Sequence, residues 1–172
     1  MTGFLRFVGL LNAAVWCGSS IFLVVALPAL FSPELKRLLT AAGVGFAAET
    51  MVARYFVVQY WCAGIALAHL FAEWLYFGRP LWRLNFGLLA VVLALSLIGG
   101  LWLQPKMRAL HVAHYFGRTT EQQIQAGKTF AGWHAASEVA NLLVIGCLIG
   151  YLWQVSRVQE SPRFVSFSKI RG

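Results

Sequence analysis

Four long apolar segments, separated by shorter polar stretches, dominate the sequence. They run over about residues 4–31, 55–77, 81–103 and 129–153. Each segment exceeds the roughly 20 residues that a helix needs to cross a hydrocarbon core about 30 Å thick. The pattern therefore predicts an all-α integral membrane protein built as a bundle of four transmembrane helices.

The first two connections carry helix and turn signals. Ser32, Pro33 and Glu34 predict a helix start, with Ser32 as the N-cap and Pro33 in the first helical position. We expect a short amphipathic helix that lies at the membrane interface and ends at residues 43–45, Gly-Val-Gly. Residues 78–80, Gly-Arg-Pro, predict a tight turn, so the second and third spans should be antiparallel neighbours.

The third connection predicts a helical hairpin that projects from the membrane between the third and fourth spans. Pro105 should kink the third helix without ending it, because residues 106–116 still have a helical pattern, and Gly117 fits a C-terminal cap. Thr119 and Gln122 predict a capping box that opens the next helix. About 12 extra residues in each arm, at 1.5 Å per residue, give a protrusion of about 18 Å.

The chain divides into one membrane domain and a tail. We expect residues 1–155 to form the four-helix domain and residues 156–172 to form a polar C-terminal tail. Four spans place both termini on one side of the membrane. The basic residues are divided equally between the two sides, but Arg79 and Arg83 flank the short second connection and the tail is basic, which favours cytoplasmic termini.

Composition agrees with a membrane location. Hydrophobic residues make up 59% of the 172 residues, charged residues make up 12%, and the mean hydropathy is +0.69. Soluble domains carry about 45–50% apolar and about 25% charged residues. The net charge of +8 comes from dispersed basic residues without a basic run. This excludes a nucleic-acid partner and favours the lipid bilayer, with other membrane subunits or a second copy as protein partners.

Polar residues inside the spans are the candidates for a functional site, because such groups are costly in a bilayer and usually face the bundle interior. His69 and His134 are each followed four residues later by a glutamate, Glu73 and Glu138, so each pair shares a helical face. Depth counting separates the two histidines by about 13 Å along the membrane normal. One metal ion could not reach both.

The same counting sorts the polar residues into two layers. The first layer is expected to hold Ser19, Ser20, Gln59, Ser96, His134 and Glu138. The second is expected to hold Asn12, His69, Asn85 and Asn141, with Glu73 nearer the interface. Each layer either fixes helix register by mutual hydrogen bonds or surrounds an ion, a water chain or a cofactor. The candidate binding residues are therefore His134, Glu138, His69, Asn141 and Gln59.

Several ligands fit this set. His69 lies among small residues that would admit a haem or chlorophyll ring, whereas a methionine-rich copper relay is disfavoured by only three methionines. Glu138 with His134 offers part of a proton path. In the hairpin, a face with Met107, His111 and His114 is either a soft metal site or a stripe that covers the hairpin seam. No cofactor-independent catalytic motif is present, so we do not expect an enzyme without a cofactor.

Three stretches taken in order resemble a known family. They are residues 16–18 (Trp-Cys-Gly) with 27–31 (Leu-Pro-Ala-Leu-Phe), residues 104–108 (Gln-Pro-Lys-Met-Arg), and residues 130–134 (Phe-Ala-Gly-Trp-His) with Asn141. Over about residues 4–154, the chain resembles the transmembrane-protein-205-like family of unknown function. That family is similar in layout to copper-resistance-protein-D-like membrane proteins, and the resemblance implies a role in metal tolerance.

The wider group includes haem-binding protoporphyrinogen oxidases, which carry a histidine on the first span just before the Trp-x-Gly motif. The matching stretch here, residues 10–14, holds Asn12 and no histidine, which argues against oxidase chemistry. His134 matches the fourth-span histidine of the resembled family. The resemblance therefore makes His134 the first choice for a functional residue.

Three functional hypotheses follow. The first is a protein of the bacterial cytoplasmic membrane that binds a small ligand, a metal ion or a porphyrin in the bundle around His134 and Glu138. The second is an accessory subunit of a larger energy-transducing membrane complex. The third is an enzyme of the porphyrin-oxidase type.

Overall fold

The computed structural model describes residues 2–77 and 83–156, which are helical apart from three short connections. The elements are α1 (Thr2–Leu30), α2 (Pro33–Leu38), α3 (Ala41–Phe77), α4 (Arg83–Leu97), the π-helical segment η1 (Ile98–Leu103), α5 (Gln104–Phe116) and α6 (Thr120–Ser156). Four helical stretches of the described residues, in α1, α3, α4 to α5, and α6, are long and apolar enough to cross a membrane. The predicted all-α, four-span architecture is confirmed.

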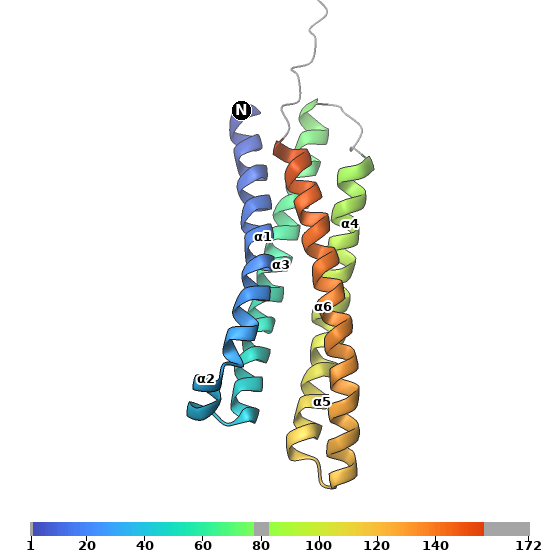
Figure 1. Ribbon diagram of the computed structural model, residues 1–172. Coiled ribbons are helices and arrows are strands. Elements are labelled where there is room, and N and C mark those ends of the chain that lie inside the picture. Colours follow the sequence, from blue (N-terminus) through green and yellow to red (C-terminus); the bar gives the residue numbers. More distant parts are fainter. Residues whose placement is uncertain (1, 78–82, 157–172) are drawn as a thin grey trace, which may run out of the picture.

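The long helices form a bundle in which α1 and α4 each pack against both α3 and α6 (Figure 1). Its apolar core surrounds Trp16, Val92, Leu148 and Tyr151, which are almost completely buried. Toward the end of the bundle that is opposite the N-terminus, the first turns of α3 contact α5, and α5 packs against α6 as a hairpin. The bundle opens there, with α2 at the foot of α1 and away from the hairpin (Figure 1).

The helix start at Ser32 is confirmed, but the predicted end of the short helix is wrong. The Ser32 hydroxyl accepts a hydrogen bond from the Leu35 amide at 3.4 Å, with Pro33 in the first turn. α2 already ends at Leu38, and residues 43–45 lie inside α3. The reason is a second cap, because the Thr40 hydroxyl accepts from the Gly43 amide at 3.2 Å and starts the long helix early.

The projecting hairpin is confirmed. Helix continues from α4 through η1 into α5 past Pro105, and the Thr119 hydroxyl accepts from the Gln122 amide at 3.3 Å to start α6. Gly117 follows α5 as predicted, but with φ −60° and ψ 145° it has an ordinary extended backbone. Its carbonyl accepts a hydrogen bond from the Gln123 side chain at 3.0 Å. The predicted turn at residues 78–80 and the predicted tail after residue 156 lie outside the described residues.

The π-helical segment η1 packs closely against α3. A Cβ on Gly99 would lie 2.7 Å from the Phe56 ring, and a Cβ on Gly100 would collide with the Tyr60 hydroxyl. The two glycines therefore let the aromatic face of α3 sit directly on η1. The Tyr60 hydroxyl donates to the Ser96 carbonyl at 3.4 Å, just before the segment begins.

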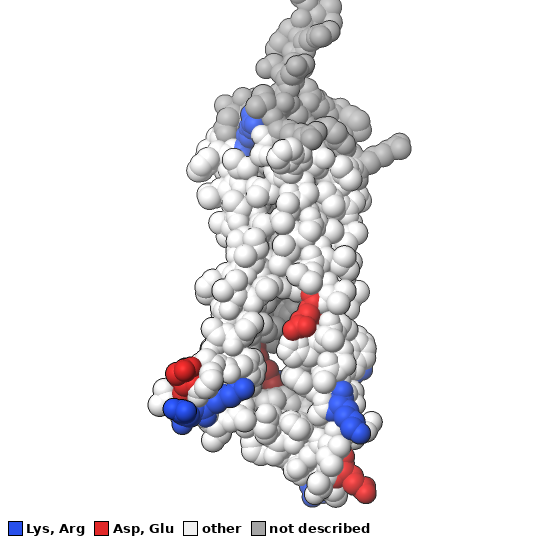
Figure 2. Space-filling view, viewed as in Figure 1, with Lys and Arg blue, Asp and Glu red and all other residues white. Residues whose placement is uncertain are grey.

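Charged side chains mark the edges of the membrane. Figure 2 shows a broad uncharged band across the bundle, with most charged side chains gathered toward the hairpin end. On the third span, residues 84–105 carry no charge, and these 22 residues cover about 33 Å, close to the thickness of a hydrocarbon core. Lys106 and Arg108 then mark the edge, beyond which the α5–α6 hairpin projects.

Candidate functional site

Gln59 lies in the middle of the bundle, and its side chain forms hydrogen bonds with three side chains on two other helices. Its side-chain oxygen accepts hydrogen bonds from the Trp16 indole and, at 3.3 Å, from the Ser96 hydroxyl. Its side-chain nitrogen donates to the Ser20 hydroxyl at 3.0 Å. The predicted grouping of Ser20, Gln59 and Ser96 is confirmed. This amide bonds to protein groups on both sides, as expected of a residue that fixes helix register.

Asn141 belongs to this same central network, and its predicted place in the second layer is wrong. The Tyr55 hydroxyl lies 3.1 Å from the Asn141 side-chain oxygen and 3.1 Å from the Ser20 hydroxyl, so its single proton can be donated to either. Ser20 itself donates to the Trp16 carbonyl at 3.0 Å. Through Asn141, α6 is thereby bonded to α3 at mid-bundle, beside the Ser20 hydroxyl of α1.

His69 lies toward the other end of α3, enclosed by α1. Its Nε2 atom is 2.9 Å from the Leu5 carbonyl oxygen, so this nitrogen carries the proton and donates. A Cβ on Gly9 would lie 2.5 Å from the same atom, which shows how closely the ring rests on α1. Glu73 is 3.9 Å away. An iron atom bound through Nε2 would have to displace the bond to Leu5.

We call the central set of hydrogen-bonded side chains the Gln59 network; it contains Trp16, Ser20, Tyr55, Gln59, Ser96 and Asn141. His134 and Glu138 do not belong to it, and their predicted place in the first layer is wrong. Their side chains, 49% and 67% exposed, are 3.5 Å apart along α6. Because Tyr55 and Asn141 are in contact, they lie at the same depth in the bundle. Along α3, His69 is fourteen residues beyond Tyr55 toward the end that holds the N-terminus. Along α6, His134 is seven residues from Asn141 toward the hairpin end. The 21 residues amount to about 31 Å, so the two histidines are much further apart than predicted.

The error in depth has a structural cause. The prediction assumed that the spans beginning near residues 55 and 129 enter the membrane at one level. α3 and α6 instead begin at Ala41 and Thr120 and extend beyond the apolar band by different lengths. Counting from the first apolar residue therefore misplaces α6 relative to α3.

A third histidine–glutamate pair, absent from the predicted site, joins α3 to α5. Glu49 Oε1 lies 2.9 Å from His111 Nδ1, although the two groups are not aligned as a hydrogen bond, so we describe them as a close polar pair. Both side chains are largely buried, at 19% and 7% exposed. The exposed Arg108 places its Nε 3.9 Å from the other Glu49 oxygen.

The His111 ring is held tightly. A Cβ on Gly45 would collide with it, and the rings of Phe46 and Tyr115 approach it edge-on at 5.0 and 4.9 Å. Its Nε2 atom is buried without a hydrogen-bond partner among the described residues. The signal in the sequence was Gly45 followed four residues later by Glu49, which puts a small residue and a carboxylate on one face of α3.

His114 lies at the seam between α5 and α6. Of the two alternatives for its helical face, a soft metal site or a stripe that covers the seam, its position fits the second. Its Nδ1 lies 2.9 Å from the Gln123 carbonyl oxygen, and a Cβ on Gly127 would lie 2.8 Å from the same nitrogen. Within the part of the chain that the structure describes, no three His, Cys, Asp or Glu side chains come together in a way that would hold a metal ion.

One aromatic ring separates the two histidine–glutamate pairs at the open end of the bundle. Phe130 lies 6.2 Å from the His111 ring and 6.0 Å from the His134 ring, edge-on to the latter. We call Glu49, His111, Phe130, His134 and Glu138 the mouth site. Figure 2 shows the surface hollowed between α1 and α6 at this end, with acidic side chains along the hollow.

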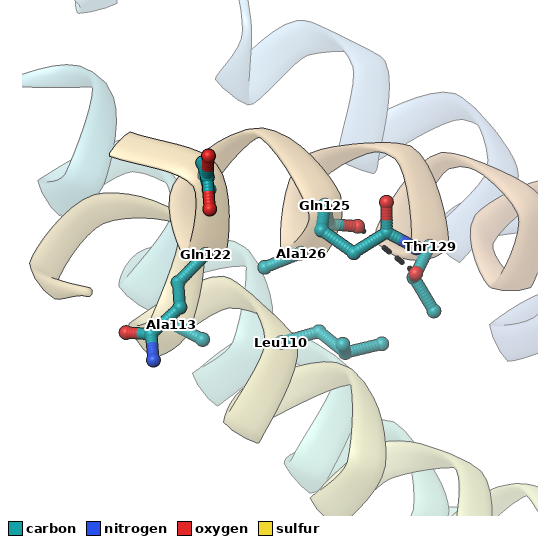
Figure 3. A pocket seen from close by; sticks show the side chains of 7 residues that line it. Leu110, Ala113, Gln122, Gln125, Ala126 and Thr129 are labelled. Carbon is teal, nitrogen blue, oxygen red and sulfur yellow. Dashed lines mark hydrogen bonds between the residues drawn. The ribbon is translucent and has the colours of Figure 1, made fainter. Parts of the chain in front are cut away.

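A separate groove of about 460 Å³ runs along the outer face of the α5–α6 hairpin (Figure 3). Leu110, Ala113 and Ala126 form its apolar wall, with Gln122 and Gln125 beside them. The Thr129 hydroxyl, also in the groove, donates to the Gln125 carbonyl of its own helix at 2.9 Å. None of the candidate binding residues lines this groove.

Comparison with known proteins identifies a family but no activity. A family described as a domain of unknown function (DUF4149) matches residues 11–115, more than half of the chain. The match includes Gln59, Glu49 and His111 and ends before His134. No curated protein and no solved structure matches the chain. The resemblance to the transmembrane-protein-205-like family and to copper-resistance-protein-D-like proteins stays a prediction.

Proposed function

The chain belongs to the DUF4149 family of unknown function, and we propose that it is a polytopic membrane protein that binds a lipophilic organic cation at the mouth site. The observation that carries this proposal is the exposed His134–Glu138 pair on α6, next to the Phe130 ring. A carboxylate beside the hydrocarbon core is costly and is usually paired or functional.

Glu138 is the accessible acid of the mouth site. The carboxylate of Glu49 already faces the His111 imidazole and the Arg108 guanidinium, and it is largely buried. Glu138 faces the His134 imidazole alone among the described residues, at 3.5 Å, and most of its side chain is exposed. A positively charged ligand would therefore meet Glu138 first.

Aromatic rings beside an acid favour an organic cation. Phe130 lies next to His134, and aromatic faces attract cations by about 0.5–2 kcal/mol. α1 also carries exposed apolar side chains, such as Phe22 and Val25. A lipophilic cation would place its charge near Glu138 and its apolar groups toward the lipid.

Thermal unfolding of the full chain in mild detergent tests the proposal, with tetraphenylphosphonium as the probe. A ligand that binds only the folded state raises its stability by RT ln(1 + L/Kd), where L is the free ligand concentration. We expect the probe to raise the Tm of the wild type and to leave that of Glu138→Gln unchanged. Glu73→Gln is the matched control, since Glu73 belongs to the histidine–glutamate pair outside the mouth site, whose imidazole is enclosed by α1.

The control should respond like the wild type. Equal Tm shifts in wild type and Glu138→Gln would overturn the proposal, because the probe would then act through the micelle or another site. A parallel titration with Zn²⁺ separates the ligand classes. A Zn²⁺ shift that Glu138→Gln removes, without a tetraphenylphosphonium shift in the wild type, would assign the site to a metal ion instead.

A further inference from the structure

Lys106 is held between two tryptophans at the membrane edge. Its Nζ lies 4.8 Å from the centre of the Trp102 ring and 4.1 Å from that of the Trp133 ring. The two indoles meet edge-on with their centres 5.2 Å apart. The ammonium group is therefore fixed in place at the point where the third span leaves the uncharged band.

These three side chains have unused hydrogen-bond donors. Among the described residues, no carboxylate pairs with Lys106 and no acceptor takes the indole N–H of Trp102 or Trp133. The ammonium carries three N–H donors and each indole carries one. A cluster of donors with a fixed positive charge suits an anion with several oxygen atoms.

Charge at this end of the molecule is complementary to an anionic lipid. The basic residues on the hairpin side of the band are Lys36, Arg37, Arg54, Lys106, Arg108, Arg118 and Lys128, against the acids Glu34, Glu49, Glu121 and Glu138. Seven bases against four acids leave a net charge of +3 there. Anionic headgroups are attracted by about 1 kcal/mol per basic residue near the surface.

Local helix geometry builds the cluster. Trp102 and Lys106 are four residues apart across the join between η1 and α5, so they share a face, and Trp133 comes from the facing helix α6. One turn deeper in the band, Ile98 and Leu101 are exposed and offer an apolar surface to acyl chains. Tryptophan and lysine at this depth are typical of contact with lipid headgroups.

We propose that Trp102, Lys106 and Trp133 form a binding site for the phosphate group of an anionic phospholipid. The ammonium group provides the charge, and the two indoles both hold it and donate to the phosphate oxygens. The site lies outside the mouth site and does not depend on the function proposed for it.

Native mass spectrometry of the full chain in detergent tests this site, with phosphatidylglycerol as the probe and phosphatidylcholine for comparison. Lys106→Met keeps an unbranched apolar side chain against the two indole rings and removes the positive charge. We expect it to weaken binding of the first phosphatidylglycerol about tenfold, the value of one charge-assisted hydrogen bond of about 1.5 kcal/mol. Lys106→Arg should restore most of the affinity, because it returns the charge over the rings.

Lys128→Met is the matched control, an exposed lysine on the same hairpin with no aromatic partner among the described residues. It should bind phosphatidylglycerol like the wild type. Equal weakening by Lys128→Met and Lys106→Met would overturn the proposal in favour of diffuse attraction to the basic end. Unchanged binding by a folded Lys106→Met, judged by circular dichroism, would overturn it as well.

Discussion

At the mouth site, the absence of a side chain on Gly45 lets α3 and α5 approach each other closely. Gly45 lets the His111 ring rest on α3, and Phe46, Tyr115 and Phe130 surround the ring. A side chain at position 45 would force the ring into these neighbours. The apolar segments do not indicate this contact, because Gly45 and Glu49 precede the segment that begins near residue 55; only the four-residue spacing of Gly45 and Glu49 indicates it.

We therefore expect Gly45→Ala to destabilise the protein. Overpacking in a filled site costs about 1–3 kcal/mol, and the better helix propensity of alanine returns up to about 1 kcal/mol. The expected net loss is about 1–2 kcal/mol in the free energy of unfolding, measured by denaturant titration in detergent. Gly64→Ala is the control, since nothing lies within 4 Å of its added Cβ. A Gly45→Ala protein as stable as Gly64→Ala would contradict the packing described for His111.

At the scale of elements, the Gln59 network sets the register of the spans. Gln59 on α3 bonds to Trp16 and Ser20 on α1 and to Ser96 on α4, while Tyr55 links α3 to Asn141 on α6. Hydrogen bonds between helices in membrane proteins average about 0.6 kcal/mol each. Three bonds through one amide therefore couple α3 to both α1 and α4.

Gln59→Leu should therefore lower the free energy of unfolding by about 2 kcal/mol, since it removes three such bonds. Asn141→Leu removes one bond and should cost about 0.6 kcal/mol. Unfolding in a mixed-micelle denaturant titration measures both. Gln125→Leu, on the exposed face of α6, is the control and should change little. If Gln59→Leu were as stable as this control, the network would have no part in fixing register.

Local helix signals were more predictable than helix depth. Ser32 and Thr119 were identified as caps because a hydroxyl before a helical stretch has a direct chemical reason to be there. The predicted depths of the polar residues were wrong, because depth depends on how far each helix extends beyond the membrane. The apolar segments do not show this length. His134 and Glu138 were thus recognised as a pair but assigned to the wrong neighbours, while the grouping of Gln59 with Ser20 and Ser96 was correct.

At the scale of the whole molecule, the hairpin gives the bundle two unlike ends. The α5–α6 hairpin and α2 lie at the end opposite the N-terminus (Figure 1). The mouth site lies there as well, because its His111 is on α5. The spans themselves were predictable because their apolar length far exceeds what a soluble domain carries. The separation of α1 from the hairpin was not predictable, because the apolar segments do not show how the helices pack (Figure 1).

We predict that the hairpin end faces away from the cytoplasm, as the basic residues of the second connection and the tail suggest. The test labels Gln122→Cys, in a protein whose Cys17, Cys62 and Cys147 are replaced, with a membrane-impermeant maleimide. Position 122 is exposed near the tip of the hairpin and should react in intact cells. Labelling only after lysis would reverse the orientation.

Equilibrium dialysis of radiolabelled tetraphenylphosphonium against the purified full chain tests the central claim most directly. The account predicts saturable binding of one cation per chain, lost in Glu138→Gln and retained in Glu73→Gln. Saturable binding that is equal in the wild type and Glu138→Gln, or no saturable binding to the wild type at all, would contradict the assignment of the mouth site as a cation site.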